Sequence, residues 1–147
     1  MPIIRACGNC GQKNRIPAKN LTGEVRCGAC KSPLTPIPEP LEVDEALFDE
    51  VVHHTTVPVL VDFWAEWCAP CRMAAPEVSR TAADLAGKAL VLKVDTEKHP
   101  QLAARFHVQG IPNFVILLNG HVVRQQAGLV RHDQMERWLT AAAPAAS

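Results

Sequence analysis

All six cysteines of the chain fall into Cys-x-x-Cys pairs, and the three pairs lie in two different kinds of sequence. The pairs are Cys7/Cys10, Cys27/Cys30 and Cys68/Cys71. The first two lie in a polar segment with few large apolar residues, whereas the third follows an apolar run. No stretch is apolar for long enough to span a membrane, and the N-terminus lacks the apolar core of a signal peptide, so we expect a cytoplasmic protein. Because thiols stay reduced there, the cysteines are expected to bind metal or to carry out redox chemistry rather than to form a disulfide framework.

Charge and proline content divide the 147 residues into segments. The first 35 residues carry six basic side chains against one acidic side chain, and the rest carries nine against fourteen, so a neutral chain has a basic N-terminal part. Four prolines between residues 33 and 40 favour extended backbone and predict a semi-rigid linker. We therefore expect a four-cysteine module over residues 1–32, the linker over 33–40, a larger domain over 41–142 and a flexible tail over 143–147.

From residue 41 onward, patterns typical of helices and of strands alternate. Asp44 is a predicted N-cap for a helix whose apolar face includes Leu47 and Val51. The other predicted elements are a strand over 59–64, a helix over 70–86, a strand over 89–94, a short helix over 99–106, two strands over 114–118 and 121–126 joined by an Asn119-Gly120 turn, and a last helix around Met135. This order predicts an α/β fold in which helices cover both faces of a mixed sheet.

The third cysteine pair lies where a thiol becomes reactive. Cys68 follows a predicted buried strand and precedes a predicted helix, so its thiolate faces unpaired backbone N–H groups and the positive end of the helix dipole, which lower the pKa. Cys71 lies one helical turn later, within disulfide reach, so one cysteine can attack a disulfide while the other resolves it. The alternatives are that the two are inert core thiols or half of a metal site.

Several further segments accompany this pair. They are residues 61–72, which read VDFWAEWCAPCR, together with Lys93, Gly110-Ile111-Pro112 and Asn119-Gly120. With these motifs and the element order, residues 41–142 resemble the thioredoxin family. The resemblance implies a thioredoxin fold and a thiol–disulfide oxidoreductase that reduces protein disulfides, with a part in electron transport and cell redox homeostasis.

The resemblance also implies a role for each matched residue. Cys68 would be the attacking thiolate and Cys71 the resolving thiol. Asp62 would assist proton transfer at Cys71, and its lone charge in a buried strand independently predicts a raised pKa, although a purely structural carboxylate is the alternative. Lys93 would be its partial counter-ion, unless its amine lies in solvent. The residues implied to contact substrate are Trp67, Ala69, Pro70, Ile111, Pro112 and Gly128.

Pro112 is implied to follow a cis peptide bond, which exposes the backbone of Ile111 for pairing with an extended substrate peptide. Two residues depart from the family pattern. Ala69 stands where a glycine is usual, which leaves the redox potential open. Asn113 stands where the family often has threonine, which would alter substrate contacts.

The first two pairs enclose 16 residues, a spacing that fits a zinc ion held by Cys7, Cys10, Cys27 and Cys30. Metal binding would supply folding energy that this polar segment lacks. Two disulfides are the alternative. A zinc-ribbon-like module in front of a thioredoxin domain resembles the bacterial thioredoxin 2 group, in which the module is linked to regulation and to oxidative stress.

Partners and cofactors follow from the same resemblance. An NADPH-dependent thioredoxin reductase would supply electrons, and disulfide-containing proteins would be the substrates. The chain has no dinucleotide-binding fingerprint, so no bound flavin or nicotinamide is expected. The module has no aromatic residue for base stacking, so nucleic acid is not an expected partner. The alternative functions are a redox-sensing chaperone that releases zinc, and a zinc-ribbon adaptor or nucleic-acid binder.

Overall fold

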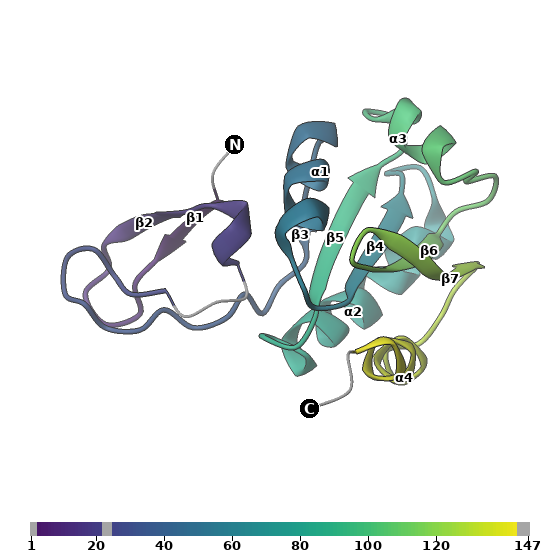
Figure 1. The fold of residues 1–147 in the computed structure, drawn as a ribbon. Helices are drawn as coiled ribbons and strands as arrows, with labels where there is room; N and C mark the ends of the chain where they lie inside the picture. Colours follow the sequence, from purple (N-terminus) through teal and green to yellow (C-terminus); the bar gives the residue numbers. More distant parts are fainter. Residues whose placement is uncertain (1–2, 22–24, 144–147) are drawn as a thin grey trace.

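The computed structural model describes residues 3–21 and 25–143, which form a small two-stranded unit and a larger α/β unit (Figure 1). In the small unit, strands β1 (Ile3–Ala6) and β2 (Lys13–Ile16) pair antiparallel, and the short 3-10 helix η1 (Ala18–Asn20) follows. Helix η1 packs against the first helix of the larger unit. Within the described ranges, no helix combines the length and the apolar character that crossing a membrane requires.

The larger unit is built on a five-stranded mixed sheet. Its strands are β3 (Leu41–Glu42), β4 (Val59–Trp64), β5 (Leu90–Asp95), β6 (Asn113–Leu118) and β7 (His121–Ala127). Their order across the sheet is β3-β5-β4-β6-β7, with β3, β5 and β4 parallel and with β6 and β7 each antiparallel to its neighbours. The helices are α1 (Glu45–His54), α2 (Ala69–Asp84), α3 (Pro100–Arg105) and α4 (His132–Ala142).

Alternate residues of β4 point to opposite faces of the sheet. Val61 and Phe63 pack in the cluster that contains residues of α1 and α3, whereas Leu60 packs in the cluster that contains residues of α2 and α4. Helices therefore cover both faces of a mixed sheet, which confirms the predicted fold class. Strand β3 was not predicted, because two residues are too few to show a periodic pattern.

Two local predictions are confirmed. The backbone N–H of Leu47 donates a hydrogen bond of 2.8 Å to the side chain of Asp44, which therefore caps α1. Asn119 and Gly120 both have positive φ, at 51° and 80°, as a two-residue turn of type I′ requires. This turn fixes the register of β6 and β7.

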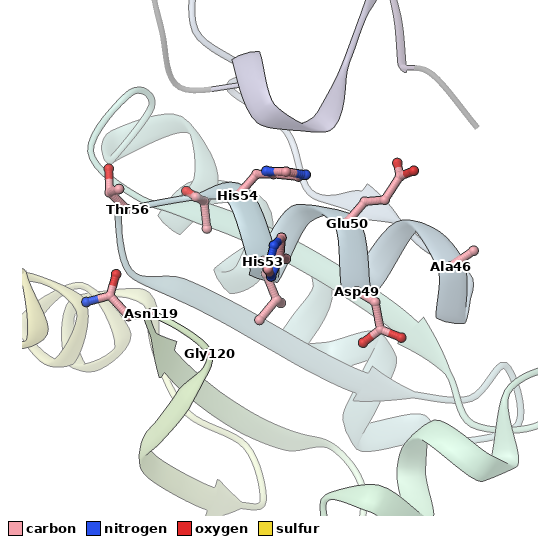
Figure 2. Close-up of a pocket in the computed structure, with 10 residues that line it drawn as sticks. Ala46, Asp49, Glu50, His53, His54, Thr56, Asn119 and Gly120 are labelled. Carbon is pink, nitrogen blue, oxygen red and sulfur yellow. The ribbon is translucent and has the colours of Figure 1, made fainter.

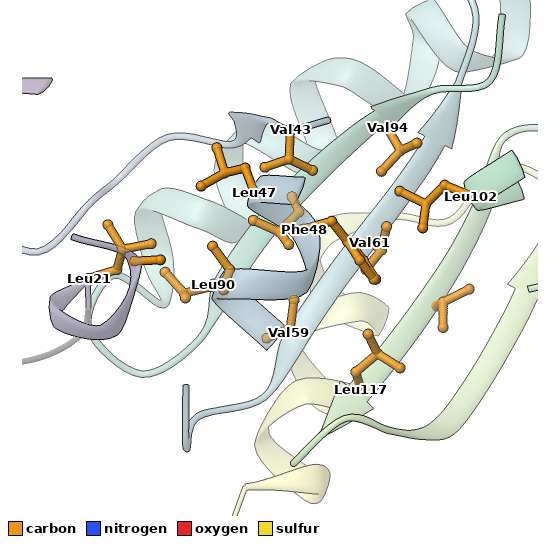
Figure 3. Packing of buried hydrophobic residues seen from close by; sticks show 14 of the residues in the cluster. Leu21, Val43, Leu47, Phe48, Val59, Val61, Leu90, Val94, Leu102 and Leu117 are labelled. Carbon is orange, nitrogen blue, oxygen red and sulfur yellow. The ribbon is translucent and has the colours of Figure 1, made fainter. Parts of the chain in front are cut away.

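The small unit contributes to the main hydrophobic core. Ile16, Ala18 and Leu21 are buried in the cluster that also contains Phe48 of α1 and Leu90 of β5. Figure 3 shows Leu21, Phe48 and Leu90 among the side chains of this cluster. The small unit has few apolar residues of its own, and these three are buried in the same cluster as residues of the larger unit. The two units thus share one core rather than forming two separate cores.

The proline-rich segment over residues 33–40 contacts both units. Ile37 is buried in the shared core, and Arg5 Nη1 of β1 lies 3.3 Å from Glu39 Oε1. The segment therefore adds to the packing instead of serving only as a spacer. The domain boundaries predicted at residues 32, 40 and 142 stay predictions, and the predicted tail over 143–147 lies, apart from Ala143, outside the described residues.

The shared core predicts that a substitution in the small unit weakens the larger unit. Ile16→Ala is expected to lower the free energy of unfolding by about 2–4 kcal/mol, because it opens a cavity in the cluster that the two units share. All three tryptophans lie in the larger unit, so tryptophan fluorescence during urea unfolding measures the effect there.

Ile4→Ala is the matched control, since Ile4 lies in the same hairpin and its side chain is 57% exposed. It is expected to change the free energy of unfolding by less than about 0.5 kcal/mol. Equal effects of the two substitutions would contradict the shared core.

Candidate redox and metal sites

Cys68 and Cys71 form a disulfide at the N-terminus of α2. Cys68 is the N-cap residue of this helix, and the backbone N–H of Cys71 donates to Cys68 Sγ over 3.2 Å. Both residues are buried at this end of the helix. The N–H group and the helix dipole favour negative charge on Cys68, so in the reduced chain this sulfur is the one disposed to be a thiolate.

The loop before β6 lies against the disulfide. The Ile111–Pro112 peptide bond is cis, and the Ile111 carbonyl oxygen lies 3.7 Å from Cys68 Sγ. Gly128 donates its backbone N–H to the Pro112 carbonyl over 2.8 Å, with a φ of 95° that favours glycine. The structure thus brings together Cys68, Ile111, Pro112 and Gly128, which the sequence places far apart.

Exposed apolar side chains lie close in sequence to the buried sulfurs. Trp67 is 67% exposed, and its indole Nε1 donates to Glu97 Oε1 over 2.9 Å, which holds the ring in one orientation. Met73 on α2 is 64% exposed, and Ala69 and Pro70 are also exposed. The sequence reasoning missed Met73 and Glu97. Met73 lies two residues after the cysteine pair in a predicted helix, and this position could have indicated that it lies near the redox pair. No comparable signal in the sequence indicated Glu97.

Asp62 lies in the middle of β4 and is 2% exposed. Its Oδ1 is one of two buried side-chain polar atoms without a hydrogen-bond partner among the described residues; the other is Trp64 Nε1. Burial raises the pKa of Asp62, the Lys93 ammonium opposes this rise, and the charge of Glu42 adds to it, so that the pKa is about 7 with all three effects together. A carboxyl with this pKa exchanges protons near neutral pH.

Three charged residues form one row across three strands. Glu42 in β3 pairs with Lys93 in β5, and Lys93 pairs with Asp62 in β4, so the three side chains lie on the same face of the sheet. Lys93 Nζ lies 4.5 Å from the centroid of the Trp64 ring, a cation–π contact. Burial raises the pKa of Glu42 as well. The sequence reasoning named Asp62 and Lys93 but missed Glu42, which lies in the unpredicted strand β3.

The other four cysteines form a compact sulfur cluster in the small unit. The sulfur atoms of Cys7, Cys10, Cys27 and Cys30 all lie within 4.8 Å of one another. The Sγ atoms are 3.7 Å apart for Cys7 and Cys30 and 3.6 Å apart for Cys10 and Cys27. Within the described residues, these four are free thiols and are the one group of three or more histidine, cysteine or acidic side chains close enough to hold a metal ion.

Tight turns and N–H groups support this cluster. The N–H of Gly11 donates to the Cys7 carbonyl over 2.8 Å, and the N–H of Lys31 donates to the Cys27 carbonyl over 3.0 Å, so each pair is closed by a turn. The backbone N–H groups of Asn9 and Ala29 each lie 3.4 Å from the first sulfur of their pair. Such donors stabilise thiolates and orient them toward a shared ion.

A separate cavity of about 670 Å³ lies between α1 and the β6–β7 turn (Figure 2). Asp49, Glu50, His53 and His54 project from α1 around it (Figure 2). No cysteine lines it, so it is distinct from both sulfur sites. It was not predicted from the sequence.

The fold and the Cys68–Cys71 centre define a thiol–disulfide oxidoreductase, and comparisons with known proteins agree. The family model described as Thioredoxin matches residues 39–141. The chain is 37% identical over 137 residues to Thioredoxin C-3 of Corynebacterium nephridii, covering 93% of each chain. It is 43% identical over 98 residues to Thioredoxin 1 of Nostoc sp., covering 67% of this chain and 92% of the relative. The chain therefore belongs to the thioredoxin family.

Solved structures show the same relationship. A mutant thioredoxin from Halobacterium salinarum NRC-1 superposes with a TM-score of 0.67 at 32% identity, covering 75% of this chain and 96% of that chain. The match with Thioredoxin C-3 is longer and reaches into the four-cysteine module, since it covers 93% of this chain. The four-cysteine cluster beside a thioredoxin domain matches the N-terminal module of a thioredoxin 2-like protein.

The raised pKa of Asp62 predicts a pH-dependent stability. A carboxyl whose pKa is higher in the folded chain than in the unfolded chain contributes stability that is full below about pH 4 and is lost as the pH rises through 7. The Asp62→Asn variant has no carboxyl at this position, so its stability does not decrease in this way as the pH rises. The stability of the wild type is therefore expected to fall relative to the variant by on the order of 4 kcal/mol between about pH 4 and pH 8, as measured by urea unfolding of the oxidised protein.

Two controls sharpen this measurement. Glu50→Gln removes an exposed carboxyl on α1 and is expected to follow the pH dependence of the wild type. Glu42→Gln keeps Asp62 but removes the charge that raises its pKa, so the midpoint of the pH dependence is expected to move to lower pH. If Asp62→Asn and the wild type lose stability in parallel, the pKa of Asp62 is not raised.

Proposed function

We propose that this chain is a thioredoxin 2-like protein-disulfide reductase that works in the cytoplasm, with Cys68 and Cys71 as its redox pair. The observation that carries the proposal is the position of Cys68 Sγ, which lies at the N-terminus of α2 and 3.7 Å from the Ile111 carbonyl. A thiolate at this place meets a substrate disulfide beside exposed backbone. The family membership of the chain supports the same chemistry.

The first step is attack by the Cys68 thiolate on one sulfur of a substrate disulfide. A bond forms between Cys68 Sγ and that sulfur, the substrate S–S bond breaks, and the second substrate sulfur leaves as a thiolate that takes a proton from water. Exposed Trp67 and Met73 offer apolar contact area to the protein that carries the disulfide, while Ala69, Pro70 and Gly128 leave room for its approach.

The second step releases the reduced substrate. Cys71 gives its proton to the Asp62 carboxylate, and its thiolate attacks Cys68 Sγ, which forms the Cys68–Cys71 disulfide and frees the first substrate sulfur as a thiolate. The freed substrate thiolate then takes a proton from water, and Asp62 returns to water the proton that it accepted from Cys71. In total, the substrate gains two electrons and two protons, and the chain loses them. With a pKa of about 7, Asp62 is partly ionised at neutral pH and can take this proton, and Lys93 limits how far that pKa rises.

Return to the dithiol needs two electrons from outside the chain. In our proposal an NADPH-dependent thioredoxin reductase supplies them, as the family membership suggests, and the chain itself binds no flavin or nicotinamide. Disulfide-containing proteins are the substrates. This places the chain in electron transport and in the redox homeostasis of the cell.

In our proposal, a single zinc ion occupies the four-cysteine cluster. Zn–S bonds of about 2.3 Å in a tetrahedral site separate the sulfur atoms by about 3.8 Å. Two of the six sulfur–sulfur separations, 3.7 Å and 3.6 Å, are close to this value, and all six are within 4.8 Å. Bound zinc would hold the two turns of the module together and so stabilise the core that the module shares with the thioredoxin domain.

Zinc release is the proposed route to regulation under oxidative stress. Each peroxide molecule would take two electrons from a pair of thiolates, leaving a disulfide and water, and the ion would lose its ligands. The module would then lose the stabilisation that the metal supplies.

Replacing the attacking sulfur tests the reductase. Cys68→Ser is expected to lower the rate of insulin reduction, measured with NADPH and thioredoxin reductase, by more than about 100-fold, because a hydroxyl is not a nucleophile at neutral pH. Cys71→Ser is expected to accumulate a mixed disulfide with insulin, visible as a mass increase on non-reducing gels. Substantial turnover by Cys68→Ser would refute the proposal, and zinc-ribbon adaptor or chaperone functions would then account better for the chain.

Metal content tests the module. The full chain purified under reducing conditions is expected to hold one zinc ion per chain by elemental analysis. Cys27→Ser is expected to lose the metal and to unfold at lower temperature, whereas Cys71→Ser, the matched control, keeps the metal. A metal-free chain with disulfides among Cys7, Cys10, Cys27 and Cys30 would contradict the zinc site.

A further inference from the structure

We infer that Asn113 and Gln125 act together as a clamp that holds the Ile111–Pro112 backbone against Cys68 and so sets the affinity for extended peptide substrates. This inference rests on the proposed reductase function. Asn113 and Gln125 are positioning residues, because they act through the loop rather than through the reacting sulfur.

Three side-chain hydrogen bonds form the clamp. Asn113 Nδ2 donates to the Gly110 carbonyl over 3.2 Å. Gln125 Nε2 donates to Asn113 Oδ1 over 3.1 Å and to the Phe106 carbonyl over 2.9 Å. The bonds therefore hold the loop over residues 106–112, which joins α3 to β6, at its first residue and at Gly110 near its other end; within the described residues this loop belongs to no strand.

The register of the sheet makes this pair possible. Asn113 pairs with Ala127 across β6 and β7, so Gln125 is its diagonal neighbour on the same face. Asn113 is 5% exposed, and a buried amide is costly unless its polar atoms have partners. Here Gly110 and Gln125 supply a partner to the nitrogen and to the oxygen, so the amide has a defined orientation.

The clamped carbonyl lies next to the substrate-facing backbone. Gly110 immediately precedes Ile111, whose carbonyl lies 3.7 Å from Cys68 Sγ. Pro112 is tied on its other side by the hydrogen bond from Gly128. A loop fixed at these points presents its backbone in one position, and a pre-organised edge binds an extended peptide with less loss of conformational freedom.

The clamp should matter for peptide substrates but not for the chemistry of the sulfur. A small aromatic disulfide such as 5,5′-dithiobis(2-nitrobenzoic acid) reacts with Cys68 without pairing to the Ile111 backbone. Insulin chains need that pairing. Loss of the clamp is therefore expected to raise the half-saturating concentration of insulin while the limiting rate and the rate with the small disulfide stay nearly constant.

Gln125→Glu and Gln126→Glu give a matched pair for this test. Both add one negative charge to β7, but only Gln125→Glu removes the donor of two clamp bonds, since Gln126 Nε2 donates only to the Ala127 carbonyl. The full-length chain is reduced chemically, and single-turnover oxidation by insulin or by the small disulfide is followed by tryptophan fluorescence. Gln125→Glu is expected to raise the half-saturating insulin concentration about five- to tenfold, with both other rates within about twofold of the wild type.

Gln126→Glu is expected to match the wild type in all three quantities, and Gln125→Ala, which adds no charge, is expected to match Gln125→Glu. Equal insulin affinity for Gln125→Glu and Gln126→Glu would overturn the inference. A matching loss of rate with the small disulfide would also overturn it, because the defect would then lie in the redox centre. A wild-type chain that fails to reduce insulin at all would instead refute the proposed function.

Discussion

Strand β4 is buried on both faces, and the positions of the redox groups depend on it. Its backbone pairs with β5 on one side and with β6 on the other, so it cannot shift without breaking both ladders. One pairing sets Asp62 beside Lys93, and the other sets the start of β6, with Pro112, beside the end of β4. Cys68 follows this strand after three intervening residues. Burial also supplies the cost of ionising Asp62, which moves its pKa toward neutrality.

The same Cys-x-x-Cys spacing serves two kinds of chemistry because the surroundings differ. At Cys68/Cys71 the pair opens a long helix and packs against Ala65, Trp64 and Ile111, and the two cysteines bond to each other. At the other two pairs, tight turns bring four sulfurs together, and each sulfur has more than one neighbour. Spacing alone does not separate these cases; the residues before and after each pair do.

Much of the fold and of the redox site could be predicted from the sequence. A long apolar strand, a Cys-x-x-Cys pair before a helix and an Asn-Gly turn are local signals, and each gave the observed element. The contributions that were missed depend on partners distant in sequence. Glu42 lies beside Lys93 because β3 pairs with β5, and Gln125 reaches Asn113 because it is a diagonal neighbour across β6 and β7. Ile16 joins a core built mostly by residues after position 40, and nothing near it in the sequence indicates this.

The shared core has a consequence for how the two parts of the chain can be separated. Ile16, Leu21 and Ile37 are buried in one cluster with apolar side chains of α1 and β5. Removal of residues 1–40 would take away these packing partners, and newly exposed apolar patches promote self-association. The module and the linker are therefore part of the packing of the domain, independently of what the sulfur atoms bind.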